Sequence, residues 1–329
     1  MRADATKRWG VLALLAGALA LNSAAAPAQS WPSRPVRVMV GFAPGGPNDI
    51  IARAYGARLA EAFGQPFIVE NRTGAGGNLA AEAVARAAPD GYTLTLGSTG
   101  PSAVNPALYA KLPFDLVRDL DMVSLVATGN SALALHPGVP AANVKELIAL
   151  ARSQPGKLTY ASSGNGSSLH LAAELFKQMA GVDLVHVPYK GAALAMTDLV
   201  SGQVDMSFAP VANVVPLAKS GKLRLLALTG ARRSAFAPGT PTLAESGLPG
   251  FDVWTWYAIL STAGTPEEVV KRLHAALVKI AQNPQLKEQL ANIGIDAEAS
   301  ASPAEARAYR AGEVEKWGKL VRAIGVKAE

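Results

Sequence analysis

Three loops rich in glycine and small polar residues are the parts of this sequence best suited to bind a small molecule. They span residues 42–49 (FAPGGPND), 71–78 (NRTGAGGN) and 162–168 (SSGNGSS). Each follows an apolar run and precedes an amphipathic stretch, so each should join a strand to a helix. Glycine lets the backbone approach a ligand, and the first turn of a helix offers unpaired N–H groups and the positive end of the helix dipole. These features suit a carboxylate or a phosphate.

The elements that must hold these loops alternate along the chain. The predicted strands are 36–42, 67–70, 93–97, 158–161, 184–187, 205–209 and 223–229. The predicted helices are 47–63 and 79–88, with others centred near Ala149, Leu175 and Leu199. This alternation, with short loops between the elements, predicts an α/β fold with mainly parallel strands. Open parallel sheets bind ligands outside the carboxyl ends of their strands, where the three loops would lie.

The last eighty residues are predicted to be helical. Three helix-start signals support this, because each combines a polar capping residue with proline at the first helical position. They are Thr265-Pro266-Glu267-Glu268, Asn283-Pro284 and Ser302-Pro303-Ala304-Glu305. The acidic residues at these starts should cap helices, and His274 should be a partly buried helix residue rather than a ligand.

The N-terminus has the order of a secretory signal. Arg2, Lys7 and Arg8 precede an apolar run at 11–21 and a stretch of small residues at 22–28. The apolar run is too short to cross a bilayer, which takes about 20 residues in a helix. We therefore expect residues 1–28 to be a cleaved signal peptide that directs the protein to the periplasm.

Composition narrows the class of protein. The chain has 329 residues, half of them hydrophobic, and the part after the signal is long enough for two lobes. Cysteine is absent, which excludes thiol catalysis, cysteine-ligated metal and lipid attachment through cysteine. The net charge is +6, but the basic residues are scattered and aromatic residues make up only 6%, so nucleic-acid binding has little support.

Familiar catalytic and cofactor motifs are missing or incomplete. Residues 164–169 nearly match the dinucleotide fingerprint, but Leu169 takes its sixth position and no ribose-binding acid follows the next strand. The phosphate-binding P-loop and the hydrolase motif G-x-S-x-G do not occur. His170 and Glu174 form only half of a metal site. The sequence thus predicts no cofactor and no metal, while Asp49 could cap its loop or contact a ligand, and Lys190 could bind an anion or lie in solvent.

Several motifs in a fixed order carry a family resemblance. They are Pro44-Gly45-Gly46 with Asp49, Glu70-Asn71-Arg72 with 74–78, 89–94 (PDGYTL), Gly164 with Gly166-Ser167 and His170-Leu171, 187–191 (VPYKG), 202–205 (GQVD) and 263–266 (AGTP). Together they resemble the Bug receptors of tripartite tricarboxylate transporters, the TctC family. The resemblance covers nearly the whole chain after the signal.

The resemblance implies a type II periplasmic-binding-protein fold, in which two lobes, each with a mainly parallel sheet flanked by helices, are joined by two crossover strands. Lobe one would be residues 31–129 and 253–329, and lobe two residues 130–252. The implied protein is a monomer and no enzyme. It would capture a small carboxylate-bearing ligand between its lobes and deliver it to the permease subunits of a transporter. A ligand sensor that feeds a signalling system, or a secreted hydrolase that uses Asp49, Asp205 or His170, are the alternatives.

The resemblance also implies a set of ligand-binding residues. From lobe one these are Phe42, Pro44, Gly45, Gly46, Asn48, Asp49, Gly76, Asn78 and Thr99. From lobe two they are Ser163, Gly164, Ser167, His170, Tyr189, Lys190 and Asp205. Two residues depart from the family pattern, because Ala43 stands where a second proline is common and Asn48 where threonine is common. Amino-dicarboxylates, citrate-like acids and aromatic acids all stay open as ligands.

Overall fold

The computed structural model describes residues 31–109, 111–165, 167–189 and 192–327. Its contacts divide the chain into a short unit that ends at Arg34 and a compact unit that begins at Pro35. In the first unit, the described residues 31–34 include a cis peptide bond between Trp31 and Pro32. The predicted signal peptide, residues 1–28, lies outside the described residues.

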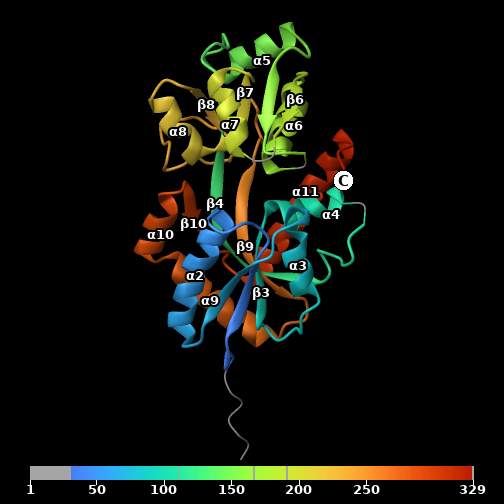
Figure 1. Ribbon diagram of the computed structural model, residues 1–329, viewed down its shortest axis with the longest axis vertical. Coiled ribbons are helices and arrows are strands. Elements are labelled where there is room, and N and C mark those ends of the chain that lie inside the picture. The colour runs from blue at the N-terminus through green and yellow to red at the C-terminus, as the bar shows by residue number, and fades with distance from the viewer. Residues whose placement is uncertain (1–30, 110, 166, 190–191, 328–329) are drawn as a thin grey trace, which may run out of the picture. The chain divides into compact units, whose positions relative to one another are not determined.

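One mixed sheet of ten strands organises the second unit (Figure 1). Two groups of parallel strands form what we call the first and the second sheet section. The first section contains β1 (Val36–Val40), β2 (Phe67–Asn71) and β3 (Thr93–Ser98), with β1 in the middle. The second section contains β5 (Thr159–Ser162), β6 (Val185–Pro188) and β7 (Met206–Pro210), with β5 in the middle.

Two long antiparallel strands, β4 (Leu120–Leu135) and β9 (Trp254–Thr262), connect the sections (Figure 1). β9 pairs with β3 on one side and with the first part of β4 on the other. The last five residues of β4 pair with β7, and four of them also pair with β8 (Arg224–Leu228). A short strand, β10 (Ile295–Ala297), adds to the first part of β4.

Helices pack on the sheet and bury its apolar residues. In sequence order the helices are α2 (Pro47–Phe63), α3 (Asn78–Ala85), α4 (Asn105–Leu108), α5 (Val144–Ser153), α6 (Ser168–Ala180), α7 (Ala192–Ser201), α8 (Val211–Lys219), α9 (Glu267–Ala281), α10 (Pro284–Ala291) and α11 (Pro303–Ile324). A 3-10 turn at Ala75–Gly77 precedes α3, and a π-helical turn at Gly100–Val104 precedes α4. Large side chains such as Trp256, Trp317, Phe176 and Phe208 are fully buried in the core. In the described part of the chain, no helix has both the length and the apolar character needed to cross a membrane.

The predicted fold class is confirmed, and most predicted elements lie within two residues of their observed bounds. The helix at Pro47–Phe63 has the bounds that the sequence predicted. Asn283 and Ser302 cap their helices as predicted, because their side chains accept hydrogen bonds from the backbone N–H groups of Leu286 and Glu305.

Two predictions about the last eighty residues are wrong. This region is not wholly helical, since it contains β9 and β10. Thr265 does not cap α9, because its hydroxyl donates to the carbonyl of Thr262 and Pro266 takes the capping position without a side-chain hydrogen bond. Proline at this position sets an extended entry into the helix by itself, and the Thr265 hydroxyl closes the turn after β9 instead.

Glu313 of α11 ties the C-terminal helix to the connecting strand β9. Its side chain is nearly buried and accepts hydrogen bonds from the indole N–H groups of Trp256 and Trp317, at 3.0 and 2.9 Å. Lys316 Nζ forms an ion pair with Glu313 at 2.6 Å and also donates to the backbone carbonyl of Asp252 just before β9. A single carboxylate therefore satisfies two buried indoles and fixes α11 beside β9.

Replacing Glu313 by alanine should destabilise the protein by about 2–5 kcal/mol, because two buried indole N–H groups lose their acceptor. Glu315 is a matched control, since it lies on the same helix and its side chain pairs with Lys319 while 67% exposed. Glu315→Ala should leave the free energy of unfolding close to that of the wild type. Urea denaturation measures both values, and equal losses in the two variants would contradict the role given to Glu313.

Candidate functional site

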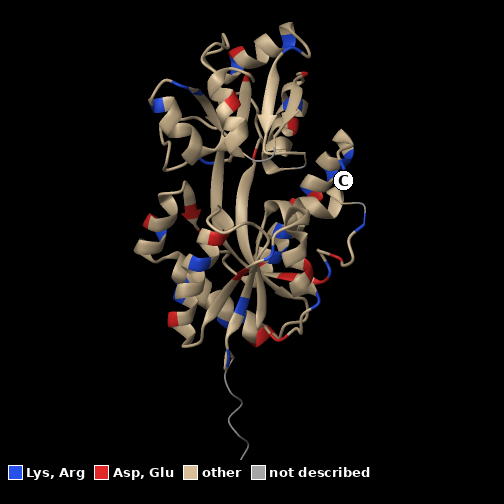
Figure 2. Cartoon of the chain, viewed as in Figure 1, with Lys and Arg blue, Asp and Glu red and all other residues tan. Residues whose placement is uncertain are grey.

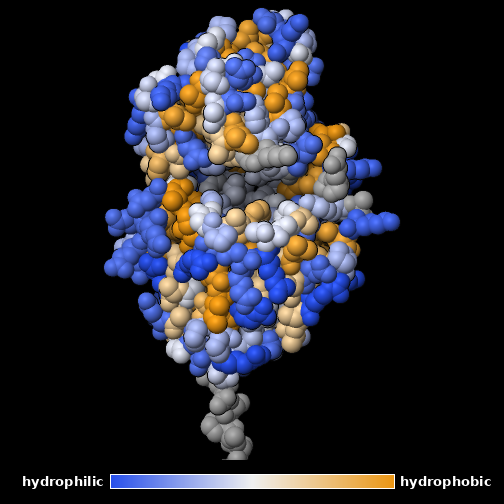
Figure 3. All heavy atoms as spheres, viewed as in Figure 1, coloured by the Kyte–Doolittle hydropathy of each residue, from blue (hydrophilic) through white to orange (hydrophobic). Residues whose placement is uncertain are grey.

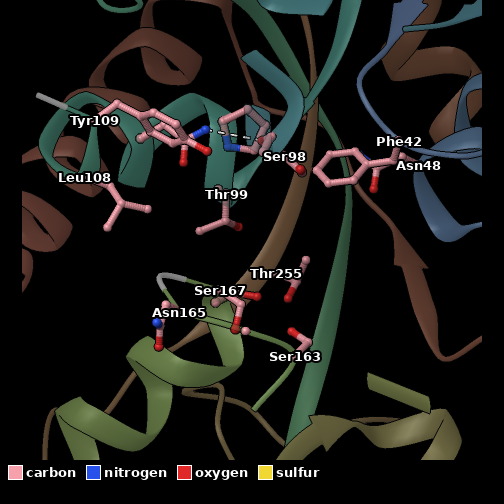
Figure 4. A pocket seen from close by; sticks show the side chains of 16 residues that line it. Phe42, Asn48, Ser98, Thr99, Leu108, Tyr109, Ser163, Asn165, Ser167 and Thr255 are labelled. Carbon is pink, nitrogen blue, oxygen red and sulfur yellow. Dashed lines mark hydrogen bonds between the residues drawn. The ribbon is translucent and has the colours of Figure 1, made fainter. Parts of the chain in front are cut away.

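A pocket with a volume of about 380 Å³ lies where loops of the first and second sheet sections face each other. The molecular surface has a hollow between the two sheet sections (Figure 3). Side chains from both sections surround the pocket (Figure 4). The first section contributes Phe42, Asn48, Gly76, Ser98, Thr99, Gly100, Pro101, Asn105, Leu108 and Tyr109. The second section contributes Ser163, Gly164, Asn165, Ser167 and Ser168, and β9 contributes Thr255.

The loop 42–49 is held by the carboxylate of Asp49. This carboxylate accepts hydrogen bonds from the Gly45 N–H at 3.0 Å and from the Asn71 amide at 2.9 Å, and it forms an ion pair with Arg53 at 2.9 Å. The hydrogen bond from Arg53 is the largest cause that lowers the pKa of Asp49 to about 2, and the bonds from Gly45 and Asn71 add to it against the effect of burial. With its oxygens occupied by these three partners, Asp49 shapes the loop in front of α2.

The loop 71–78 is tied to the segment that follows β3. The side-chain amide of Asn105 donates to the Asn78 side chain at 2.7 Å and to the Gly76 carbonyl at 3.2 Å. Gly76 and Gly77 both have positive φ, at 62° and 94°, which favours glycine at these positions. The loop therefore lies against α4, an element that the sequence did not predict.

The loop 162–168 leads into α6 and closes the pocket from the second section. The Ser167 hydroxyl caps α6 by accepting a hydrogen bond from the His170 N–H at 3.2 Å. Gly164 has a φ of 128°, and the Tyr189 N–H donates to the Ser162 carbonyl just before it. The start of α6 is thus presented to the same space as the start of α2.

The strand β9 forms part of the pocket wall through Thr255, and Thr99, which follows β3, is hydrogen-bonded to β9. The Thr99 hydroxyl accepts a hydrogen bond from the Trp256 N–H at 2.9 Å and lies 3.3 Å from the Trp254 carbonyl, to which it donates. Thr255, between these two residues, lines the pocket itself. A ligand in the pocket would touch one of the two strands that connect the sheet sections.

The described residues that line the pocket include no charged side chain. Lysine, arginine and the acidic residues lie mainly elsewhere on the molecule (Figure 2). Neutral donors take their place: hydroxyl groups, side-chain amides and the N-terminal turns of α2 and α6, whose dipoles favour an anion. Asn48 is only 8% exposed, and its side-chain Nδ2 has no hydrogen-bond partner within the described residues. Asn48 therefore keeps a buried donor available at the pocket.

Seven of the sixteen predicted site residues line this pocket, and they come from both sheet sections. They are Phe42, Asn48, Gly76, Thr99, Ser163, Gly164 and Ser167. Lys190 lies outside the described residues.

The other predicted residues lie behind the pocket or away from it. Pro44, Gly45 and Gly46 belong to the loop 42–49 but do not line the space, and Asp49 and Asn78 are buried behind it. His170 is buried in the first turn of α6. The Tyr189 hydroxyl donates to the Asp198 carboxylate at 2.7 Å. Asp205 precedes β7, where its carboxylate accepts hydrogen bonds from the N–H and hydroxyl of Thr159, so it lies at the opposite end of that strand from the pocket.

Sequence reasoning missed nine residues that line the pocket. They are Ser98, Gly100, Pro101, Asn105, Leu108, Tyr109, Asn165, Ser168 and Thr255. Asn165 and Ser168 belong to a loop that the sequence did single out. The segment 98–102 (STGPS) directly follows a predicted strand and has the composition of the three chosen loops, so the same criterion could have found it. No local signal points to Leu108, Tyr109 or Thr255.

Metal binding finds no support in the described part of the chain. No group of three or more histidine or acidic side chains is placed there to hold an ion. His170 and Glu174 share α6, but Glu174 accepts hydrogen bonds from Tyr160 and Lys177 instead.

Comparisons with known proteins point to one family. A family model described as tripartite tricarboxylate transporter family receptor (TctC) matches residues 51–326. Protein BugT of Bordetella pertussis is 34% identical over 320 residues, which are 96% of this chain and 98% of BugT. The structure of R. palustris Rpa4515 with adipate is 35% identical, has a TM-score of 0.77 and covers 90% of this chain and 99% of that one. MatC from Rhodopseudomonas palustris with bound malate is 33% identical, has a TM-score of 0.73 and covers 88% of this chain and 100% of that one.

Gly76→Ala tests the backbone requirement of the pocket. A Cβ at this position would lie 2.9 Å from the Tyr109 hydroxyl in a left-handed backbone conformation, so we expect a loss of about 1–2 kcal/mol in the free energy of unfolding. Gly100→Ala is the control, because Gly100 also lines the pocket but has open space around a Cβ. Gly100→Ala should be no less stable than the wild type in urea denaturation. A loss as large as that of Gly76→Ala would argue against the strain at Gly76.

Proposed function

The chain belongs to the TctC family of tripartite tricarboxylate transporter receptors, and from this we propose that its pocket captures a small carboxylate-bearing ligand in the periplasm. Members of this family are solute-binding receptors and not enzymes, so the chemistry of the site is binding. The resemblance drawn from the sequence motifs is confirmed.

The observation that carries the proposal is the unpaired, buried donor of Asn48 beside the first turn of α2. An unsatisfied donor costs about 1–3 kcal/mol of stability, which a bound acceptor can recover. A carboxylate suits this position because it is an acceptor-only group that the positive end of a helix dipole also stabilises. Adipate and malate, named with two of the related structures, are carboxylates of the size that a pocket of about 380 Å³ accommodates.

We propose that the two sheet sections belong to two lobes that close on the ligand. Lobe one comprises residues 31–129 and 253–329, and lobe two comprises residues 130–252. The proposed boundaries fall in β4 and directly before β9. Asn130 of β4 supports a hinge here, because its side chain accepts a hydrogen bond from the Gly230 N–H at 3.0 Å and donates to the Arg232 carbonyl at 3.2 Å. Such side-chain bonds hold the crossing segments together while the strands bend.

The signal-like order of residues 2–28 and the family support a function outside the cytoplasmic membrane. In this proposal residues 1–28 direct export and are removed, and the mature monomer diffuses in the periplasm. The closed, ligand-bound form then docks on the permease subunits of a tripartite tricarboxylate transporter. The contacts of Thr99 and Thr255 support a link between ligand and closure, because both residues join the pocket to β9.

A panel of carboxylates tests this proposal. Protein that has been unfolded and refolded to remove carried-over ligand is mixed with C4 to C6 dicarboxylates, citrate and aromatic acids. At least one acid should raise the melting temperature, because binding adds about 1.4 kcal/mol to the free energy of unfolding for each tenfold excess of ligand over Kd. The same acid should reduce the radius of gyration in small-angle scattering. If no acid in the panel produces either effect, the carboxylate assignment is wrong.

Asn48→Ala tests the donor itself. The substitution removes an unpaired buried amide, so the free protein should lose little or no stability, while affinity for the acid found in the panel should fall about 5- to 20-fold. Asn292→Ala is the control, because Asn292 is exposed at the end of α10. Isothermal titration calorimetry measures the affinities. Wild-type affinity in Asn48→Ala would remove Asn48 from the binding site.

A further inference from the structure

Three aromatic rings are stacked directly behind the loop 162–168. Tyr160 of β5 and His186 of β6 have ring centroids 4.8 Å apart and are nearly parallel. His186 also stacks on His170 of α6 at 4.1 Å with an interplanar angle of 8°, and the centroids of Tyr160 and His170 are 6.3 Å apart. His186 thus contacts both other rings of this cluster.

The edge of the His186 ring contacts the pocket loop through one side chain. His186 Nε2 lies 2.7 Å from the hydroxyl oxygen of Ser162, which is fully buried. The same hydroxyl accepts a hydrogen bond from the Gly164 N–H at 3.1 Å and lies 3.2 Å from the Gly164 carbonyl. Gly164 lines the pocket, so a chain of contacts runs from His186 through Ser162 to the ligand space.

We propose that His186 and Ser162 are positioning residues that hold Gly164 in its ligand-binding geometry, and that protonation of His186 loosens this loop and weakens ligand binding. This inference rests on the proposed function of the pocket. A neutral His186 ring packs against its two aromatic neighbours and contacts Ser162. An imidazolium in the same place would be partly removed from water, so it would move toward solvent at the edge strand β6 and release Ser162.

The charged groups around the His186 ring act in opposite directions. Among the described residues, the ionisable groups that face His186 are Tyr160 on β5 and His170, Glu174 and Lys177 on α6. Glu174 is the only acid among them, and it already accepts hydrogen bonds from the Tyr160 hydroxyl and from Lys177 at 2.9 Å. Lys177 opposes a second positive charge close by. Glu174 therefore stabilises an imidazolium at His186, but the effect of burial is larger.

The direction of the pH effect follows from burial. Burial, as the largest cause, lowers the pKa of His186 below its usual 6.5, with Glu174 opposing and Lys177 adding to this shift. Burial also lowers the pKa of His170 to about 4, so His170 stays neutral under mildly acidic conditions. Both rings are neutral above pH 6.5, and the contact to Ser162 is lost as the pH falls below 6.5 through the pKa of His186.

The test measures the affinity for adipate by calorimetry between about pH 7.5 and about pH 5.5, where histidine is the side chain that normally titrates. Affinity of the wild type should fall by more than about fivefold at the acidic end. In His186→Gln the amide can still pair with Ser162 but does not titrate, so the ratio of its affinities at the two pH values should lose most of this pH dependence. Adipate itself takes up protons as the pH falls, which weakens binding to both proteins. The result is therefore the difference in pH dependence of affinity between the wild type and His186→Gln.

Two further variants separate positioning from packing. His186→Phe keeps a stacked ring but has no group for Ser162, and Ser162→Ala removes the acceptor for the Gly164 N–H, so each should weaken adipate binding about fivefold or more at pH 7.5. His136→Gln is the control, because His136 lies away from the pocket and accepts from the Gly138 N–H. It should keep both the affinity and the pH dependence of the wild type.

The outcomes that overturn the inference are distinct from failure of the proposed function. Wild-type affinity in both His186→Phe and Ser162→Ala, or the same pH dependence in His186→Gln as in the wild type, would show that the stack does not position the loop. If the wild type does not bind adipate at all, NMR spectra of the ligand-free protein test whether protonation of His186 changes the conformation at Gly164. The Gly164 amide resonance should then shift with pH in the wild type and not in His186→Gln, and a resonance that does not shift refutes the inference.

Discussion

The pairing of β4 with strands from both sheet sections is the constraint on which the rest of the structure depends. Its first part is hydrogen-bonded to β9, and its last five residues are bonded to β7. All but two of its sixteen residues are buried, so a large loss of apolar contacts would accompany any separation of β4 from its neighbours. Because β4 is one continuous strand, it keeps the loops of the two sections facing each other. The pocket between these loops therefore depends on the pairing of β4.

Within that frame the pocket is built from backbone and neutral side chains. Two of its loops are held by a polar side chain that does not itself line the pocket, Asp49 for 42–49 and Ser162 for 162–168, and Asn105 of the pocket wall holds the loop 71–78. A neutral site avoids the cost of removing a lysine or arginine from water, and it can still favour an anion through helix dipoles and preformed donors. Specificity then comes from shape and from the direction of a few donors.

Stability and binding are linked at these positions. Glu313 satisfies two buried indoles and so strengthens the junction of α11 with β9, whereas Asn48 leaves a donor unsatisfied at a cost to the free protein. Fully paired polar groups, as around Glu313, are expected in a structural core. An unpaired buried donor, as in Asn48, is expected in a binding site without its ligand. Glu313 contacts β9 through Trp256, and Asn48 lines the pocket together with Thr255 of β9, so a change in ligand occupancy can alter the balance between an open and a closed form.

The sequence by itself determined the elements with local signals. The alternation of apolar runs and glycine loops predicted the α/β class and three loops that contribute to the pocket, and Asn283 and Ser302 marked helix starts because capping involves neighbours three residues apart. Only the tertiary structure decided the rest. Residues 129–131 (GNS) have the composition of a turn, yet long-range pairing keeps them inside β4. Thr255, Leu108 and Tyr109 reach the pocket through contacts between segments far apart in sequence, and the free energy of those contacts is not encoded in any short stretch of the chain.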